Sequence, residues 1–486
     1  MYICAHPGQF GRTMRKRRFK PYTLEQITIT NAGSEGKCIA RHDDKVIMVD
    51  YAVPGDVADL RIYGSKKSFS FAAIEKLITP SPSRVDTFCS HFGVCGGCKW
   101  QQMSYDAQLR YKQQQVQDAF ERIGKFPFPA LEPIHGSADT THYRNKLEYS
   151  FTHQKWLQNL DQKDNLNAMD HLGLGYHIPG RFDKVFDVET CWLMDDLQNR
   201  IRNRIREYCK SNGLTFFNLY SQEGLMRGLI FRNNLKGEWM LLVIFGHDQE
   251  LEKRTGLMEC LKAEFPEINS LQYIINTKRN DTITDLEVHV YSGSDHLIEY
   301  LEDLQFRIGP TTFFQTNARQ TLKLYHIARE MANLTGKENV YDLYTGVGTI
   351  ALFVARAARQ VIGIEYVEES IRDARINAQM NQISNTHFYA GDMKDVLTPE
   401  MFRTHGMPDV IITDPPRAGM HADVIQRILE ANPSRIVYVS CNPATQARDI
   451  ALMQEQYRVT KVQPVDMFPH THHVENIALL ERKTNS

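Results

Sequence analysis

Residues 342–349, DLYTGVGT, decide the fold expected for the second half of the chain. They stand between the apolar run NVYDLY, which predicts a strand, and IALFVARAA, which predicts a helix. Gly346 and Gly348 would let the backbone pass close to a ligand, and the helix start offers free N–H groups. Outward from this turn, the strand-like runs QVIGIEY, HFYAGD, DVIITDPP and RIVYVSCNP alternate with helical patterns. The alternation predicts a Rossmann-like α/β domain with a doubly wound, mainly parallel sheet, in which ligands bind beyond the carboxyl ends of the strands.

The polar residues after the first three strands indicate a nucleoside site. Glu365 ends the second strand, seventeen residues after Gly348, where a carboxylate can accept both ribose hydroxyls. Asp392 follows the third strand, where a polar side chain can meet an adenine edge. A nicotinamide dinucleotide is the alternative, but Asp342 beside the turn would repel its pyrophosphate and would not repel a sulfonium. The stretch therefore favours S-adenosylmethionine over NAD.

Two later strand ends and the C-terminal segment carry candidate catalytic residues: Asp414 in DPPR, Cys441 in SCNP and Glu475 in HHVEN. Carbon 5 of a pyrimidine is a poor nucleophile until a thiolate adds to C6. A base must then remove the C5 proton, and a donor must stabilise the developing oxyanion. We expect Cys441 to be the nucleophile and Glu475 the base. Asp414 or Arg417 would hold the uracil edge.

Each of these residues also has an ordinary structural interpretation. A single cysteine at a strand end is usually an inert core thiol, and tandem prolines after an aspartate usually form a turn. His470, His472 and His473 suggest a metal only weakly, because no distant third ligand accompanies them. The joint occurrence of a cysteine, a carboxylate and the DPPR motif in this order favours chemistry over the separate structural interpretations.

The ordered motifs resemble those of the bacterial RNA 5-methyluridine methyltransferases, the uracil-C5 family. The matching segments are FFQTN at 313–317, DLYTGVG at 342–348, DPPRAG at 414–419, SCNP at 440–443 and THHVEN at 471–476. The resemblance implies Cys441 as nucleophile and Glu475 as general base. It also implies a set of residues around the cofactor and the uracil: Gln315, Tyr344, Thr349, Glu365 and Asp414. Residues 143–146, YRNK, resemble a further family segment to which the sequence assigns no chemistry.

A cysteine cluster precedes this domain. Cys89, Cys95 and Cys98 place three thiols within ten residues, Gly96 and Gly97 permit a tight turn, and Cys191 is a candidate fourth ligand. All-sulfur ligation suits zinc or an iron–sulfur cluster, and spacing alone slightly favours zinc. The family resemblance instead implies a [4Fe–4S] cluster, which the ribosomal-RNA branch carries on this cysteine pattern. The remaining cysteines are expected to be structural: Cys4, Cys38, Cys209 and Cys260.

Short strand-like runs between residues 21 and 80 predict a small barrel of the oligonucleotide-binding type, which resembles a TRAM domain. The segment 11–20, GRTMRKRRFK, is basic and predicts an extension that contacts phosphates. We expect four parts: a basic extension at 1–20, a barrel at 21–82, an α+β central domain with the cysteines at 83–300, and the methyltransferase domain at 301–486.

Composition narrows the classes of protein further. The net charge of −1 gives no global basic signature, although local patches can still bind RNA. Nine cysteines among 486 residues are too few for a disulfide scaffold. No apolar stretch is long enough to span a membrane, so we expect a cytoplasmic protein without membrane contact or obligate protein partner.

The sequence thus predicts S-adenosylmethionine-dependent C5-methylation of a specific uridine in 23S ribosomal RNA, the RNA of the large subunit. A transfer-RNA uridine methyltransferase would have the same catalytic motifs, and the barrel and cysteines favour the ribosomal branch. A non-catalytic RNA-binding protein for ribosome assembly would not need Cys441, Glu475 and Asp414 together. An amino-group methyltransferase could use DPPR but has no use for the Cys441 and Glu475 pair.

Overall fold

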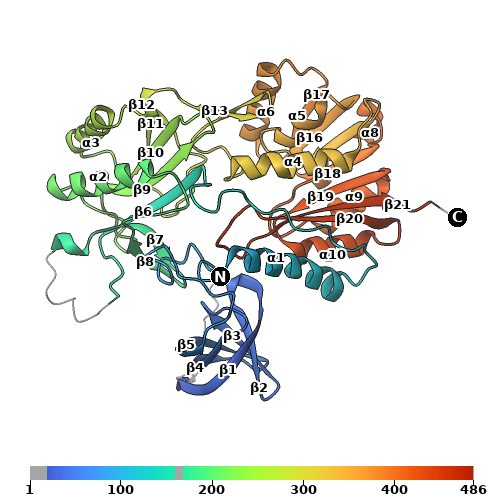
Figure 1. Ribbon diagram of the computed structural model, residues 1–486. Helices are drawn as coiled ribbons and strands as arrows, with labels where there is room; N and C mark the ends of the chain where they lie inside the picture. Colours follow the sequence, from blue (N-terminus) through green and yellow to red (C-terminus); the bar gives the residue numbers. More distant parts are fainter. Residues whose placement is uncertain (1–18, 159–167, 485–486) are drawn as a thin grey trace, which may run out of the picture. The chain divides into compact units, whose positions relative to one another are not determined.

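The computed structural model describes residues 19–158 and 168–484, and these divide into two compact units, Met1–Arg84 and Val85–Ser486 (Figure 1). Most of the basic extension expected at 1–20, and Cys4, lie outside the described residues. Among the described residues, no helix has the length and apolar character that a bilayer span requires.

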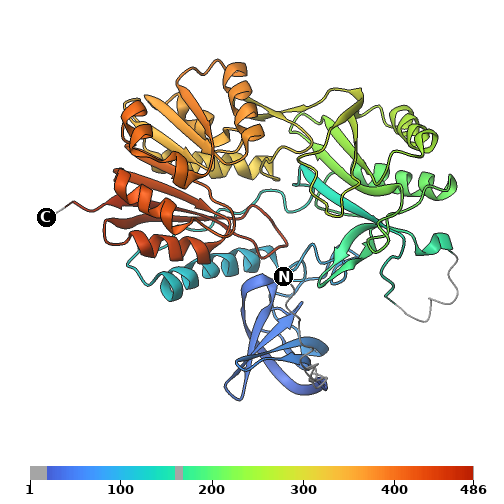
Figure 2. The same cartoon turned by 180° about the vertical axis from the view of Figure 1, so that it is seen from behind.

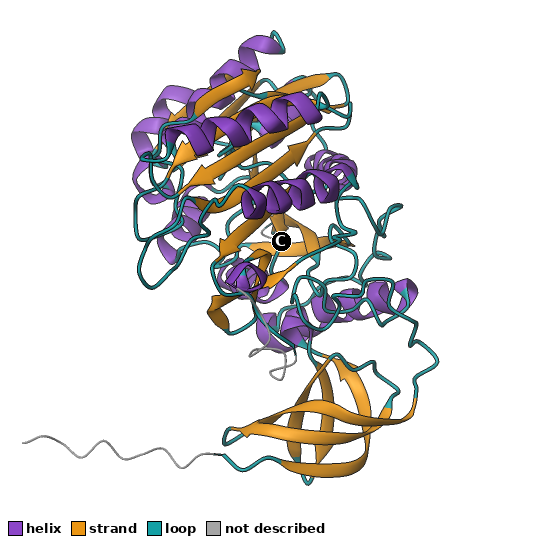
Figure 3. Ribbon diagram, turned by 90° about the vertical axis from the view of Figure 1, so that its left-hand side faces the viewer, coloured by secondary structure: helices purple, strands orange, loops and turns teal. Residues whose placement is uncertain are grey.

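The first unit is a closed five-stranded barrel, as the sequence predicted (Figure 3). Its strands, in the order β1-β2-β3-β5-β4, are β1 (Tyr22–Ala32), β2 (Cys38–His42), β3 (Lys45–Asp50), β4 (Val57–Ser65) and β5 (Phe69–Thr79), with a short 3₁₀ turn at Ser34–Gly36. Alternating residues such as Ile29, Ile47 and Leu60 are buried, as the period of two requires. Buried Asp56 accepts the N–H groups of Val53 and Ser81 at 2.7 and 2.9 Å, which fixes the end of the barrel.

The second unit begins with the cysteine segment and a long helix, and it contains two seven-stranded sheets. The first sheet has the order β12-β11-β10-β9-β6-β7-β8 and packs against two helices, α2 (Leu197–Ser211) and α3 (Leu251–Glu264). Its strands are β6 (Lys146–Thr152), β7 (Gly173–Ile178), β8 (Arg181–Asp187), β9 (Met226–Asn233), β10 (Trp239–Phe245), β11 (Ile268–Ile275) and β12 (His289–Gly293). A 3₁₀ turn at Ala168–His171 precedes β7, and the hairpin β13 (Leu297–Leu301) and β14 (Leu304–Ile308) leads to the second sheet.

The second sheet has the order β17-β16-β15-β18-β19-β21-β20. The strands are β15 (Asn339–Leu343), β16 (Gln360–Glu365), β17 (Thr386–Ala390), β18 (Val410–Thr413), β19 (Arg435–Ser440), β20 (Tyr457–Val465) and β21 (Glu475–Arg482). The first five run parallel, and β21 is antiparallel to both of its neighbours. This is the doubly wound, mainly parallel sheet that the alternating pattern predicted.

Helices cover both faces of this sheet (Figure 3). They are α4 (Ala318–Ala332), α5 (Thr349–Ala355), α6 (Glu368–Met380), α7 (Met393–Val396), α8 (Pro399–His405), α9 (Ala422–Ala431) and α10 (Pro443–Met453). Successive strand residues, such as Val340 and Tyr341, belong to opposite apolar clusters, because side chains alternate across a strand.

Helix α1 (Tyr105–Ala119), followed by one wider turn at Phe120–Gly124, also packs on this sheet domain. It precedes the first sheet in the sequence, yet Val116 and Phe120 join the apolar cluster of α9 and α10. Figures 1 and 2 show α1 beside α10. A helix that precedes the first sheet in the sequence therefore belongs to the core of the second sheet.

Candidate active site

The turn after β15 has a backbone conformation that its glycines allow. Tyr344, Gly346 and Gly348 have φ values of +64°, +55° and +82°. A Cβ on Gly348 would lie 3.1 Å from both Ala374 Cβ and the Phe388 ring, so packing requires this glycine. A Cβ on Gly346 would meet nothing within 4 Å. Gly346 thus borders open space into which a bound nucleoside could extend.

Glu365 ends β16 beside this turn. Its Oε2 accepts the N–H of Gly346 at 3.2 Å, and its Oε1 accepts the N–H of Val367 at 3.0 Å. Each oxygen keeps further acceptor capacity, and the side chain is only partly buried. The carboxylate is therefore fixed in place and still able to accept hydroxyl groups.

Asp392 lies at the same edge, because Glu365 pairs with Ala390 in the neighbouring strand. Its Oδ1 accepts the N–H of Lys394 at 3.2 Å, so the side chain caps α7. The structure gives Asp392 this capping contact, and its place near a nucleoside stays a prediction.

Asp342 stabilises the turn through buried hydrogen bonds. Its side chain is fully buried, and its Oδ2 accepts the Thr345 hydroxyl at 2.5 Å and the Ala351 N–H at 3.0 Å. Burial raises the pKa of Asp342 to about 7. Its hydrogen bonds lie within the turn and α5, and the argument that its charge selects the cofactor stays a prediction.

Two other predicted cofactor residues also contact neighbouring elements. The Thr349 hydroxyl lies 3.0 Å from the hydroxyl of Tyr325 on α4. The backbone carbonyl of Gln315 accepts the side-chain amide of Asn145 at 3.1 Å, which ties this segment to the one before β6.

The three candidate catalytic residues meet at one edge of the sheet. Asp414 follows β18, Cys441 follows the neighbouring strand β19, and Glu475 begins β21. Ser440 pairs with Asn476, so the antiparallel register brings Glu475 beside the end of β19. Residues from three separate motifs of the sequence therefore share one small region.

Burial dominates the electrostatics of this region. It raises the pKa of Glu475 to about 8, with a further contribution from Asp414 and an opposing one from Arg417. Burial raises the pKa of Asp414 to about 7. The pKa of the Cys441 thiol is raised to about 11 by burial and by the two carboxyls, against the influence of Arg417. Titratable groups with strongly shifted pKa values in one place are typical of acid–base chemistry.

Arg417 joins two of the motifs. Its carbonyl accepts the side-chain amide of Asn442 at 3.0 Å and the hydroxyl of Thr445 at 3.2 Å. Its guanidinium Nη2 lies 3.2 Å from both ring nitrogens of His473. Burial and nearby positive charges lower the pKa of His473 to about 3, so this ring is neutral beside the guanidinium.

The four predicted metal ligands share one cavity of about 190 Å³, which Cys89, Cys95, Cys98 and Cys191 line together with Arg144 and Trp192. Burial raises the pKa of the Cys89, Cys95 and Cys98 thiols, and repulsion among the four sulfurs contributes. Within residues 19–158 and 168–484, no three His, Cys, Asp or Glu side chains gather tightly enough to hold a single metal ion.

The other described cysteines contact their own surroundings. Cys38 and Cys209 are buried, and the thiol of Cys260 donates to Glu264 at 3.2 Å.

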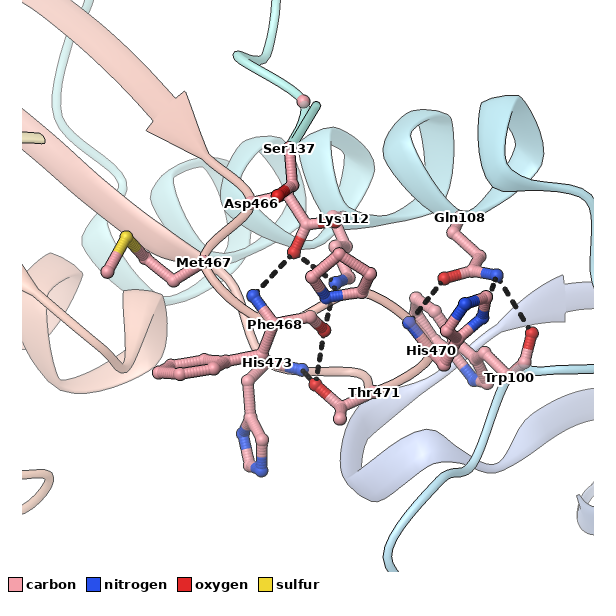
Figure 4. Close-up of polar contacts among 12 residues, drawn as sticks. Trp100, Gln108, Lys112, Ser137, Asp466, Met467, Phe468, His470, Thr471 and His473 are labelled. Atoms are coloured by element: carbon pink, nitrogen blue, oxygen red, sulfur yellow. Dashed lines mark hydrogen bonds and ion pairs between the residues drawn. The ribbon is translucent and has the colours of Figure 1, made fainter. Parts of the chain in front are cut away.

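Sequence reasoning missed the polar contacts of the segment that leads to Glu475. Gln108 and Lys112 of α1 are fully buried and contact residues 466–470 (Figure 4). Their spacing could have predicted this burial, because Gln108, Lys112 and Val116 recur every four residues and so lie on one face of the helix. A lysine in line with a buried valine indicates a buried partner.

Comparisons with known proteins agree with this fold. The family model for tRNA (uracil-5-)-methyltransferases matches residues 104–483, and the TRAM domain model matches residues 23–74. An uncharacterised RNA methyltransferase of Bacteroides thetaiotaomicron is 57% identical over 92% of this chain and 99% of its own length. A similar protein of Porphyromonas gingivalis is 52% identical over 94% of this chain and 100% of its own length.

A solved structure resembles most of the chain. It is the Pyrococcus abyssi tRNA (uracil-54, C5)-methyltransferase in complex with S-adenosyl-L-homocysteine. The TM-score is 0.71 at 26% identity, and the match covers 93% of this chain and 100% of the other.

Proposed function

The chain belongs to the tRNA (uracil-5-)-methyltransferase family, and from that premise we propose that it methylates C5 of a uridine in large-subunit ribosomal RNA through a covalent bond to Cys441. One observation carries the proposal: Cys441, Glu475 and Asp414 lie at one edge of the sheet that also bears the glycine turn. An RNA-binding protein without catalysis would not require these three groups together.

The proposed reaction uses the thiolate of Cys441 first. Its sulfur bonds to C6 of the uracil, and the displaced electron pair makes C5 nucleophilic. Bound S-adenosylmethionine supplies the methyl group, which C5 takes from the sulfonium. The Glu475 carboxylate then removes the C5 proton, the C5=C6 double bond re-forms, and the sulfur leaves C6 with its electron pair.

The residues near the turn fit the proposed cofactor. Glu365 is fixed by two backbone N–H groups and can accept the ribose hydroxyls, while Gly346 leaves space beside it. The proposed set around the cofactor and uracil is completed by Gln315, Tyr344, Thr349, Asp392 and Asp414. Asp414 has its pKa raised to about 7, so near neutral pH it can donate or accept a hydrogen bond at the uracil edge.

We propose that the four cysteines hold a [4Fe–4S] cluster. Four thiols line one cavity, as four-sulfur ligation of a cluster requires. The cluster would serve the fold or the placement of RNA, since the methyl transfer needs no electron. Protein purified without oxygen should be brown, with about four iron and four sulfide per chain. If the protein instead contains about one zinc per chain and no iron, the four cysteines form a structural zinc site and the cluster proposal fails.

The resemblance of the cysteine pattern to that of the ribosomal-RNA branch supports ribosomal RNA as the substrate, and the cytoplasm is then the proposed location. Transfer RNA is the second candidate, because the Pyrococcus abyssi relative acts on tRNA uracil-54 by its description. The test offers equal amounts of unmodified transfer RNA and protein-free large-subunit ribosomal RNA with labelled S-adenosylmethionine. We expect label mainly in the ribosomal RNA. Label mainly in transfer RNA would overturn the substrate and leave the uridine chemistry intact.

A further inference from the structure

We propose that Gln108 and Lys112 of α1 are positioning residues that hold the loop at 466–474, here the base loop, so that Glu475 reaches the C5 proton. The inference rests on the proposed function, in which Glu475 is the general base. The base loop joins β20 to β21, and Val465 pairs with Glu475 across its two ends. The conformation of the base loop therefore determines where β21 begins and where the carboxyl group of Glu475 lies.

Lys112 anchors the first part of the base loop (Figure 4). Its Nζ lies 2.6 Å from Asp466 Oδ1 and donates to the Phe468 carbonyl at 3.0 Å. Both charged side chains have 0% exposure, so the ion pair is removed from water. The same Asp466 Oδ1 accepts the N–H of Phe468 at 2.9 Å, while Oδ2 accepts the Tyr105 hydroxyl at 2.9 Å. Removing the ammonium would leave a buried carboxylate without its counter-charge.

Gln108 anchors the middle of the base loop, one helical turn away. Its Oε1 accepts the N–H of His470 at 2.8 Å. Its Nε2 donates to the carbonyls of Trp100 and Met103 at 3.0 and 2.8 Å and lies 3.2 Å from His470 Nδ1. A single fully buried amide therefore joins the base loop to the segment that follows the cysteines.

The backbone of His470 shows that these contacts constrain the loop. Its φ is +65°, a left-handed conformation that costs a residue with a Cβ free energy and persists only where the surroundings enforce it. Its carbonyl accepts the N–H groups of Lys99 and Trp100 at 2.9 and 3.0 Å, directly after Cys98. The Tyr143 hydroxyl donates to the Pro469 carbonyl at 3.0 Å, which assigns a contact to the YRNK segment. The base loop is thus held by α1, by the cysteine segment and by Tyr143.

The test separates loss of positioning from general loss of structure. Gln108→Leu keeps the bulk of the side chain and removes the amide, and Gln114→Leu is the matched control, because Gln114 lies exposed on the same helix. Each variant receives labelled S-adenosylmethionine and whichever RNA transcript the wild type methylates. First-turnover methylation and the methylated protein–RNA adduct on a denaturing gel are measured with kcat and KM.

A misplaced base lets Cys441 attack and C5 take the methyl group but delays removal of the proton. Gln108→Leu should therefore methylate at a normal first-turnover rate and then accumulate the methylated adduct. Its kcat should fall by about ten- to a hundredfold, and KM for RNA should fall with it, because kcat/KM depends on the steps up to methyl transfer, which stay normal. Gln114→Leu should behave as wild type. Lys112→Met should show the same accumulation and provides the test if Gln108→Leu does not fold.

Two outcomes overturn different claims. If wild-type protein forms no covalent complex with RNA that contains 5-fluorouridine, the proposed function itself fails. If wild type is trapped but the folded Gln108→Leu protein shows no methylated adduct, the positioning role fails alone, whether the variant turns over normally or loses first-turnover methylation as well.

Discussion

Cys441 sits in surroundings that oppose its own ionisation. Burial and the carboxyls of Glu475 and Asp414 raise the pKa of its thiol to about 11, whereas the thiolate is the nucleophile. Arg417 is the neighbour that favours the thiolate, and it is tied to the SCNP segment through its carbonyl. The three acidic groups share one buried region, so loss of one proton raises the free energy of losing the next.

The pH dependence of the reaction follows from Glu475. A general base acts when deprotonated, and burial raises the pKa of Glu475 to about 8. We therefore expect kcat to rise with pH between about 6 and 9, as Glu475 loses its proton and can accept the one from C5. Steady-state rates across this range, with RNA integrity checked at each pH, measure the effect. A profile that falls from pH 6 to 9 would contradict the assignment of Glu475 as base.

Glu475→Gln removes the proposed base and leaves the proposed nucleophile, Cys441. Attack by Cys441 and methyl transfer should continue, but release should stall, with turnover lower by about a hundred- to ten-thousandfold. A denaturing gel with labelled methyl groups should show the protein joined to RNA. Free methylated RNA produced at the wild-type rate would show that another group removes the proton.

At the scale of elements, the strand ends were predictable and the packing of α1 was not. The motifs after β15, β16, β18 and β19 predicted a site at one edge of the sheet, because the carboxyl ends of parallel strands meet there. The barrel and the α/β fold were likewise predicted and are confirmed. Lys112 and Asp466 are 354 positions apart, and no local pattern encodes which distant loop a helix contacts.

The glycine turn offers a matched pair of substitutions. Both Gly346→Ala and Gly348→Ala place a Cβ at positive φ, which costs about 1–2 kcal/mol. Only Gly348→Ala also crowds Ala374 and Phe388, so it should lower the free energy of unfolding more than Gly346→Ala does. Gly346→Ala should chiefly weaken S-adenosylmethionine binding. Chemical denaturation and calorimetric titration check both expectations, and equal destabilisation by the two variants would contradict the packing argument.

At the scale of the whole molecule, the two units are expected to divide recognition from chemistry. The proposed catalytic and cofactor residues all lie within Val85–Ser486, and the barrel has its own core. The four-part division of the sequence stays a prediction, and the cysteine cluster stays a proposal whose cavity the structure describes. Under the proposed function, a uridine must leave its stack to reach Cys441, and an unpaired loop uridine does so at a lower cost in free energy than a paired one.

Deleting residues 1–84 tests this division of roles. RNA affinity should weaken and depend less on salt, since phosphate contacts made by the basic extension and the barrel are lost. S-adenosylmethionine binding should stay nearly unchanged, because its proposed residues are retained. Filter binding across salt concentrations and calorimetry measure the two affinities. An unchanged RNA affinity would place recognition in the second unit.

Covalent trapping tests the central claim, a bond between Cys441 and a uridine, most directly. RNA that contains 5-fluorouridine is mixed with S-adenosylmethionine and either the wild-type protein or Cys441→Ala, after cofactor binding by both is confirmed. Fluorine cannot leave C5 as a proton does, so the wild type should remain joined to the RNA on a denaturing gel, and peptide mapping should locate the link at Cys441. Cys441→Ala should give no complex. A complex that persists in Cys441→Ala would contradict the account.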